Sequence, residues 1–201
     1  NKTDNPWSYM GEFKEGIYEG QGLFIADGNY SYKGEWKNSF FHGKGKLIEE
    51  GRSTFEGEFR NDKKYFGTTK LVDGTIYTGY YKNNDAHGKG IEISKDGIKF
   101  EGNWTNGELN GKAKVTFKDG GSYVGNYKNN KKNGFGKIIF DDASYFEGEW
   151  KNSEYVKGVE VIDGEKYEGE FKNGERHGKG ILTTKDKKKL RGTWKEDKFV
   201  R

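Results

Sequence analysis

The chain repeats one glycine-centred pentapeptide at an almost fixed spacing. An aromatic residue stands two positions before and two positions after each glycine, as Tyr32 and Trp36 do around Gly34, except that Leu190 precedes Gly192. The central glycines are separated by 23, 23, 22, 23, 23, 23, 21 and 23 residues, at Gly11, Gly34, Gly57, Gly79, Gly102, Gly125, Gly148, Gly169 and Gly192. A period in the twenties that runs along a chain is typical of a solenoid built from one repeated unit.

A second short apolar segment follows each pentapeptide. A pair of glycines one residue apart opens it at Gly20/Gly22, Gly43/Gly45, Gly88/Gly90, Gly134/Gly136 and Gly178/Gly180. A turn signal ends it at Asp27-Gly28, Glu50-Gly51, Asp73-Gly74, Asp96-Gly97, Asp119-Gly120 or Asp163-Gly164. Two strands that alternate with such turns predict consecutive antiparallel β-hairpins.

Residue alternation predicts two unlike faces for this sheet. Side chains two positions apart share a face, so Tyr32 and Trp36 point one way while Lys33 and Glu35 point the other. A ring from the same or an adjacent repeat can lie in the gap above each glycine. Because a single layer has nothing to cover its aromatic face, we expect the rings to stay partly exposed.

The pattern resembles the MORN repeat (membrane occupation and recognition nexus). The resemblance rests on Tyr-x-Gly-Glu-Trp/Phe-Lys-Asn-Gly, His-Gly-x-Gly and Asp-Gly steps, and it runs from Tyr9 to Trp194. It implies an all-β fold, a single-layer antiparallel β-hairpin solenoid in the form of an elongated, twisted ribbon. We expect an N-terminal lead-in at 1–8, eight repeats at 9–189, and a C-terminal half-repeat with a basic tail at 190–201.

Composition agrees with a thin repeat protein. Only 30% of the 201 residues are hydrophobic, and 14 Phe, 13 Tyr and 5 Trp supply much of the apolar material. The chain has no cysteine, which excludes disulfides, thiolate zinc sites and a cysteine nucleophile. No apolar run is long enough for a signal peptide or a membrane-spanning helix. We expect a cytoplasmic protein, associated with the cytoskeleton or a membrane.

No residue pattern indicates catalysis. His42, His87 and His177 occupy one repeat position, so we expect them to lie far apart in structural turns rather than around a metal. The glutamates of the pentapeptides, such as Glu12 and Glu35, also recur once per repeat, and a neighbouring lysine is their expected partner. We predict no enzyme activity, no catalytic residue, no metal site, no cofactor and no small-molecule substrate.

The aromatic face predicts a protein-binding groove. Rows of tyrosine and tryptophan are common binding anchors, because they bring large rigid area with a polar handle. The expected occupant is an extended peptide, an amphipathic helix or a second copy of the chain. Similar MORN proteins serve as cytoskeletal, ciliary or membrane-junction adaptors, and several are dimeric. The residues predicted to contact a partner are Tyr9, Phe13, Tyr32, Trp36, Phe55, Phe59, Tyr77, Tyr81, Phe100, Trp104, Tyr123, Tyr127, Phe146, Trp150, Tyr167, Phe171 and Trp194.

Two other functions are open at this stage. Residues 185–201 carry eight bases and three acids, so an acidic partner or anionic phospholipid could bind at Lys185, Lys187, Lys188, Lys189 and Arg191. The chain could also be a regulatory region detached from an enzyme, because similar repeats precede lysine-methyltransferase and phosphoinositide-kinase domains. Nucleic-acid binding is disfavoured, since five arginines stand against 31 lysines.

Two repeats depart from the pattern. The segments Tyr65–Thr68 and Val156–Val159 lack the first glycine of the pair. A bulky residue in a shorter loop could change the local curvature or mark a partner contact. Drift that a nearest-neighbour fold tolerates is the alternative explanation.

Overall fold

The computed structural model describes residues 7–26 and 29–201, which fold into eighteen β-strands with no helix among them. Each odd-numbered strand carries the aromatic pentapeptide and pairs antiparallel with the even-numbered strand after it, as β3 (Tyr30–Lys37) does with β4 (Phe40–Glu49). The predicted all-β hairpin solenoid is confirmed. The expected Asp27-Gly28 turn and residues 1–6 of the expected lead-in lie outside the described residues.

The chain divides into two compact units. The first contains residues 1–96 and 104–107, and the second contains 97–103 and 108–201. The expected segments 1–8, 9–189 and 190–201 were counted from the sequence repeats, whereas the two units are defined by contacts. The expected segments therefore remain predictions.

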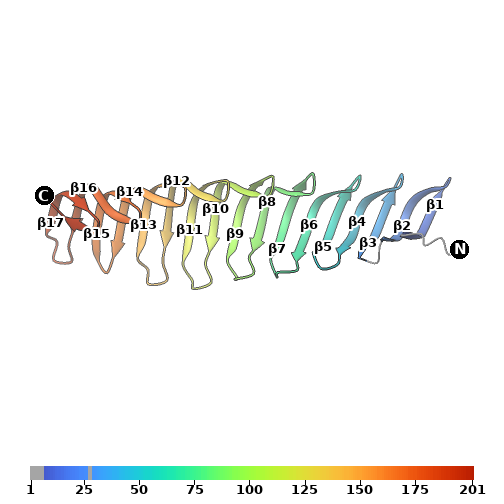
Figure 1. The fold of residues 1–201 in the computed structure, drawn as a ribbon, viewed down its shortest axis with the longest axis horizontal. Helices are drawn as coiled ribbons and strands as arrows, with labels where there is room; N and C mark the ends of the chain where they lie inside the picture. The colour runs from blue at the N-terminus through green and yellow to red at the C-terminus, as the bar shows by residue number, and fades with distance from the viewer. Residues whose placement is uncertain (1–6, 27–28) are drawn as a thin grey trace. The chain divides into compact units, whose positions relative to one another are not determined.

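In the first unit the hairpins lie side by side in one layer (Figure 1). Its strands are β1 (Trp7–Lys14), β2 (Ile17–Ala26), β3, β4, β5 (Ser53–Arg60), β6 (Lys63–Leu71), β7 (Ile76–Lys82), β8 (Asp85–Ile93) and the end of β9 (Lys99–Thr105). From β1 to β8, each strand pairs antiparallel with the next, both within a hairpin and between hairpins.

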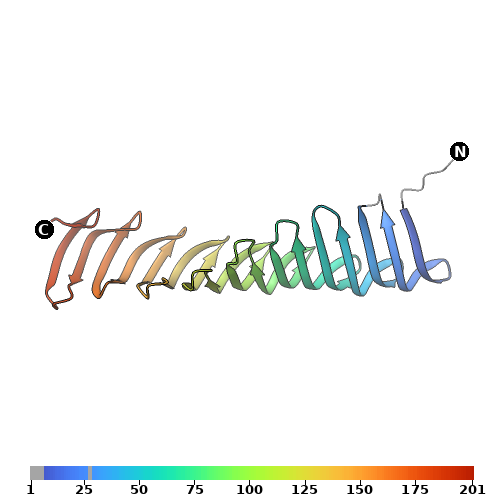
Figure 2. The same cartoon turned by 90° about the horizontal axis from the view of Figure 1, so that it is seen from below.

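The second unit has the same organisation (Figure 2). It contains the start of β9, then β10 (Glu108–Thr116), β11 (Ser122–Lys128), β12 (Lys131–Ile139), β13 (Tyr145–Lys151), β14 (Glu154–Ile162), β15 (Glu165–Lys172), β16 (Glu175–Thr183), β17 (Lys189–Lys195) and β18 (Lys198–Phe199). The two-residue β18 pairs with the end of β17, and Phe199 packs edge-on against Trp194 at 5.3 Å.

A two-residue turn joins the strands within each hairpin. In the β3–β4 hairpin, Asn38 and Ser39 have φ values of 51° and 63°, the left-handed values that a type I′ turn requires at both positions. Asparagine tolerates this conformation because its short side chain can hydrogen-bond locally. The Asp-Gly steps form the connections between hairpins instead, where Asp73 Oδ1 accepts the Thr75 N–H at 2.8 Å.

The second residue of the tight turn ties its hairpin to the preceding one. Asp62 Oδ1 accepts the Phe41 N–H at 2.7 Å, and the Asp62 N–H donates to the Phe41 carbonyl at 3.0 Å. The same pair of bonds joins Ser39 to Tyr18, Asn130 to Leu109, Ser153 to Lys132 and Asp197 to Arg176. These bonds satisfy backbone groups at the edge of the ladder and fix how neighbouring hairpins stack.

Candidate functional site

The first-strand rings pack over facing glycines. Gly34 and Gly45 are cross-strand partners, and a Cβ on Gly45 would lie 2.4–2.6 Å from atoms of the Tyr32 ring. The ring therefore fills the gap above the glycines, as expected for aromatic rescue. Its hydroxyl donates to the Glu35 carbonyl at 2.8 Å, so the polar end of the ring is satisfied as well.

Rings from neighbouring hairpins meet edge to face. Tyr32 lies 5.4 Å from Trp36 of its own strand and 5.1 Å from Phe59 of the next hairpin, at interplanar angles of 85° and 86°. This is the favourable geometry for aromatic pairs. Burial raises the pKa of Tyr127, which occupies the Trp36 position in β11, to about 12. The rings thus form the core of each unit.

The expectation that these rings stay partly exposed is wrong. The rings of Tyr32, Trp36, Phe55, Phe59, Tyr77, Tyr81, Trp104, Tyr123, Tyr127, Phe146, Trp150, Tyr167, Phe171 and Trp194 are buried, with exposed fractions of 0–9%. A single layer can bury its own face because long side chains lie flat across the glycines and cover one another. Tyr9 and Phe100 are half-buried and Phe13 is exposed, so direct contact with a partner stays a prediction for these rings.

A third position contributes to each ring cluster, and residue alternation alone did not single it out. It is the second residue of each even-numbered strand from β2 to β16, which we call the slot residue: Tyr18, Phe41, Lys64, Ala86, Leu109, Lys132, Tyr155 and Arg176. Phe41 stacks on Tyr32 at 3.8 Å, whereas the Lys132 ammonium lies 4.9 Å over the Tyr123 ring. Burial lowers the pKa of Lys64 and of Lys132.

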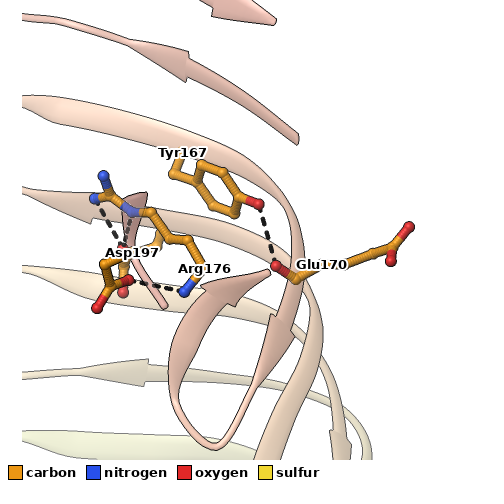
Figure 3. Close-up of polar contacts among 5 residues, drawn as sticks. Tyr167, Glu170, Arg176 and Asp197 are labelled. Carbon is orange, nitrogen blue, oxygen red and sulfur yellow. Dashed lines mark hydrogen bonds and ion pairs between the residues drawn. The ribbon is translucent and has the colours of Figure 1, made fainter. Parts of the chain in front are cut away.

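The slot residue Arg176 is held by three partners from the second unit. Its guanidinium lies 5.2 Å over the Tyr167 ring and forms a two-nitrogen contact with Glu160 Oε2, both nitrogens at 3.0 Å. The main-chain N–H of Arg176 donates to Asp197 Oδ1 at 2.8 Å, while the Tyr167 hydroxyl donates to the Glu170 carbonyl at 3.1 Å (Figure 3). A charge that is paired in this way can be tolerated inside an aromatic core.

The pentapeptide glutamates have a different partner from the one expected. Glu35 Oε1 accepts the Lys44 N–H at 2.8 Å, and Glu12 Oε1 accepts the Gln21 N–H at 2.8 Å. These N–H groups lie where the register shifts at a β-bulge, which leaves them without a ladder partner. Lysine pairing is therefore wrong at Glu12 and Glu35. Glutamate–lysine ion pairs form at other positions, at Glu101, Glu147 and Glu168.

The two atypical repeats have a shorter bulge. In the β5–β6 hairpin, Glu58 pairs directly with Phe66, whereas in β3–β4 the bulge displaces the equivalent pair. The shorter bulge places Phe66 on the charged face, 4.9 Å from Tyr80. Both atypical repeats carry phenylalanine at the first ring position, Phe55 and Phe146, where a typical repeat uses a tyrosine hydroxyl to bind bulge carbonyls. Their role in partner contact remains a prediction.

A groove lies on the face opposite the rings in the second unit. Its volume is about 1000 Å³, and it is lined by the backbones of Gly148, Gly158, Gly169, Gly180 and Gly192, and by Phe135, Tyr145, Glu147, Glu149, Lys157, Val159, Lys166, Glu168, Glu170, Lys179, Ile181, Arg191 and Thr193. The four acids and four bases among these residues balance in charge. The Phe135 side chain is 59% exposed. We call this hollow the charged-face groove.

The first unit has a smaller hollow on the same face. It has a volume of about 570 Å³ and is lined by Gln21, Lys33, Gly34, Lys44, Gly45, Lys46, Glu56, Gly57, Glu58, Phe66 and Gly67. The face that the alternation marked as merely solvated therefore carries a hollow in each unit. The ring face of the first unit also carries one, of about 400 Å³, lined by Tyr18, Phe24, Tyr30, Trp36, Ser39, Phe41 and Asp62.

The three histidines lie in strands, His42 in β4, His87 in β8 and His177 in β16, so the expectation that they lie in turns is wrong. His42 and His177 face Glu35 and Glu170 at their bulges. Among residues 7–26 and 29–201, no group of three or more histidines and carboxylates could hold a metal ion. In the same described part of the chain, no helix has the length and apolar character needed to cross a bilayer.

The predicted basic contact lies at the connection between β16 and β17. Lys185, Lys187, Lys188, Lys189 and Arg191 are all exposed. The Lys188 ammonium pairs with Asp186 at 2.8 Å, and Arg191 lines the charged-face groove. Most of these basic side chains are therefore accessible to an acidic partner or a lipid, and their role in binding remains a prediction.

Comparison with family models gives a match across most of the chain. A model described as the MORN repeat matches residues 9–30, 32–48, 55–64, 77–99, 100–122, 123–145 and 167–188. The match ends at residue 64 in the third repeat and passes over 146–166, and these are the two repeats with the short bulge. A search of curated proteins found no match.

Two solved structures match most of this chain. The first is the G-box domain of the microcephaly protein CPAP, with 13% identity, coverage of 87% of this chain and 94% of that chain, and a TM-score of 0.51. The second is the TCP domain of SAS-4 (dCPAP) from Drosophila melanogaster, in complex with a proline-rich motif of Ana2. It has 9% identity, covers 96% of this chain and 94% of that chain, and has a TM-score of 0.49. At this identity the first similarity indicates a shared fold.

Proposed function

Because this chain belongs to the MORN repeat family, we propose that it is a scaffold that binds a partner protein and does not catalyse a reaction. The observation that carries this proposal is the charged-face groove, a hollow of about 1000 Å³ floored by glycine backbone. The rings lie on the other side of the sheet, where they pack on the same glycines. The partner meets the opposite face from the one that the sequence indicated.

The lining of the groove favours an extended peptide. Phe135, Val159 and Ile181 offer apolar contact, and four glutamates, three lysines and one arginine lie among them. A peptide in extended conformation presents alternate side chains to one face, so one row of them could contact these groups. Because the charges of the groove balance, the affinity for a peptide would come mainly from apolar anchors and hydrogen bonds. The charged side chains would set the orientation of the bound peptide.

Site-specific photocrosslinking tests this proposal. A benzophenone amino acid at Phe135 or Ile181 should crosslink a partner protein in extract from the source cells, whereas the same amino acid at Val72 should not. Val72 is a matched control, since it is 76% exposed and lies outside the groove. Phe135→Ala should weaken capture about tenfold, as is typical of an aromatic anchor. Equal crosslinking from Val72, or unchanged capture by Phe135→Ala, would count against the groove.

Three further readouts separate the remaining proposals for this chain. Binding to anionic vesicles that is lost in Lys185→Glu/Lys187→Glu/Lys189→Glu, with capture intact, would support phospholipid contact at the basic connection. Crosslinks between two copies would indicate a homodimer. We further propose that the assembly belongs to the cytoskeleton or a membrane junction, as for similar MORN proteins, and localisation of the tagged protein tests this.

A further inference from the structure

A long side chain fills the slot in seven of the eight hairpins from β1–β2 to β15–β16, and in β10 this side chain is the buried Leu109. In β2, β4 and β14 a ring occupies the slot, as Phe41 does over Tyr32. In β6, β12 and β16 the cation of Lys64, Lys132 or Arg176 occupies it. In β8 the slot residue is Ala86, whose methyl group is too short to cover a ring.

The ring cluster around Ala86 is nearly identical to the one that holds Lys132. Tyr77 lies 5.2 Å from Tyr81 and 5.3 Å from Trp104, at angles of 84° and 85°. The corresponding rings, Tyr123, Tyr127 and Trp150, are separated by 5.4 Å and 5.3 Å at angles of 88° and 87°. In both clusters the indole N–H donates to a glycine carbonyl, at 3.3 Å from Trp104 and 3.1 Å from Trp150.

The Lys132 cluster shows which group such rings accept. The Lys132 ammonium lies 4.9 Å from the centre of the Tyr123 ring and 4.6 Å from that of Trp150. Both distances fall within the range of a cation–π interaction, which is strongest over tryptophan and tyrosine. Among the described cations, none lies over the Tyr77 ring.

The Tyr77 side chain is less completely buried than the tyrosines at the same position in three other hairpins. Its exposed fraction is 7%, against 0% for Tyr32, Tyr123 and Tyr167, while Phe100 is half-buried although the buried Leu109 is its slot residue. The cluster has not collapsed, because its ring separations match those around Lys132. The short methyl group of Ala86 therefore leaves part of the Tyr77 ring without the cover that a long slot residue provides.

An acid replaces an aliphatic residue beside this ring. Glu92 is the cross-strand partner of Tyr77 on the ring face, where the Lys132 cluster has Ile138 opposite Tyr123. Directly paired residues of an antiparallel sheet have Cβ atoms about 5 Å apart. Burial raises the pKa of Glu92, and the nearby Asp73 adds to this shift. A bound cation would relieve both effects.

We propose that Tyr77, Tyr81, Trp104 and Glu92 form a binding site for the primary ammonium group of a lysine side chain from a partner protein. The incoming ammonium takes the place that Lys132 occupies in its own hairpin, and Glu92 supplies the counter-charge. The site lies on the ring face, so it is distinct from the charged-face groove, and its test does not depend on the groove.

The test is a titration followed by NMR of the indole N–H groups. The probe is Nα-acetyl-lysine N-methylamide, with the uncharged norleucine analogue and choline as comparison ligands. We expect a saturable shift of the Trp104 indole resonance, with a dissociation constant on the order of 10 mM, while the Trp150 resonance stays unchanged. Glu92→Gln should weaken binding about threefold to tenfold, because the ion pair is lost.

The variant Ala86→Lys is the sharpest test, because it places a cation of the chain in the slot as at Lys64 and Lys132. It should abolish the Trp104 shift, and Ala86→Met should do so without adding charge. Lys132→Ala should make the Trp150 indole respond to the probe. The proposal is overturned if the norleucine analogue gives the same shift, if choline alone binds, or if Ala86→Lys binds the probe as the unaltered protein does.

Discussion

Adding one methyl group at Gly45 tests whether the rings are core. The φ of Gly45 lies outside the left-handed region, so alanine introduces no backbone strain there, and its cost is steric. The three atoms nearest to the new Cβ all belong to Tyr32, at 2.4, 2.5 and 2.6 Å. The ring must therefore move away from the glycine pair.

The displacement disturbs several contacts at once. Tyr32 would lose part of its stack on Phe41 at 3.8 Å, its edge contacts with Trp36 and Phe59, and its hydrogen bond to the Glu35 carbonyl. Aromatic pairs contribute about 0.5–1.5 kcal/mol each and such a hydrogen bond about 1 kcal/mol. Partial loss of these contacts should lower the free energy of unfolding by about 3 kcal/mol, the upper range for overpacking.

Hydrogen exchange of the β3 and β4 amides measures this local free energy, with urea unfolding as a global check. Gly51→Ala is the control, because no atom lies within 4 Å of its Cβ position and only its φ of 71° is strained. Gly51→Ala should lower the free energy of unfolding by about 1 kcal/mol. In a Tyr32→Leu background, Gly45→Ala should cost less than about 1 kcal/mol, since no ring obstructs the methyl group. Equal costs for the two glycines, or an unchanged cost in that background, would refute the reasoning.

Three further predictions concern the polar contacts. Asp62→Gly removes the acceptor of the Phe41 N–H and should lower stability by about 1–2 kcal/mol in urea unfolding, whereas Asp62→Asn keeps an acceptor and should cost much less. Arg176→Met leaves the half-enclosed Glu160 carboxylate without its partner and should cost about 3 kcal/mol. Adding Glu160→Leu should recover most of this loss, and no recovery would contradict the pairing. Glu92→Leu should stabilise the protein more at pH 7 than at pH 3.5. Burial raises the pKa of Glu92 above its ordinary 4.5, so its contribution is intact at low pH and is lost as the pH rises through the folded-state pKa. A pH-independent effect in thermal unfolding would contradict this.

Local pattern was enough to predict the hairpins and the two faces. Period-two alternation around Gly34 places Tyr32 and Trp36 on one face, and the structure has them there. The central glycines of the pentapeptides were correctly assigned to close approach of a ring. These features follow from contacts between residues that are near in sequence or directly paired across a hairpin.

Burial of the ring face could not be read from the same pattern. Residue alternation shows on which face of the sheet a ring lies. It does not show whether the ring then lies flat on the sheet and is covered by other side chains. Phe41 supplies the cover for Tyr32, and it sits in the segment that the sequence marked only as a connection. The repeat period held a usable signal, since Phe41, Lys64 and Ala86 are 23 and 22 residues apart in one column.

The turn contacts were missed for a related reason. Asp62 binds Phe41 across 21 residues, a separation that no local rule addresses. Only alignment of the repeats with one another would show that a polar residue recurs at the end of most of the tight turns.

The central claim is that the rings are core and the partner binds the charged face. Hydroxyl-radical footprinting of the free and partner-bound protein tests both halves together. The account predicts fast oxidation of Phe135 in the free protein, slow oxidation of Trp150 and Phe171 in both states, and protection of Phe135 on binding. Fast oxidation of Trp150 and Phe171 that the partner suppresses, with Phe135 unaffected, would contradict it.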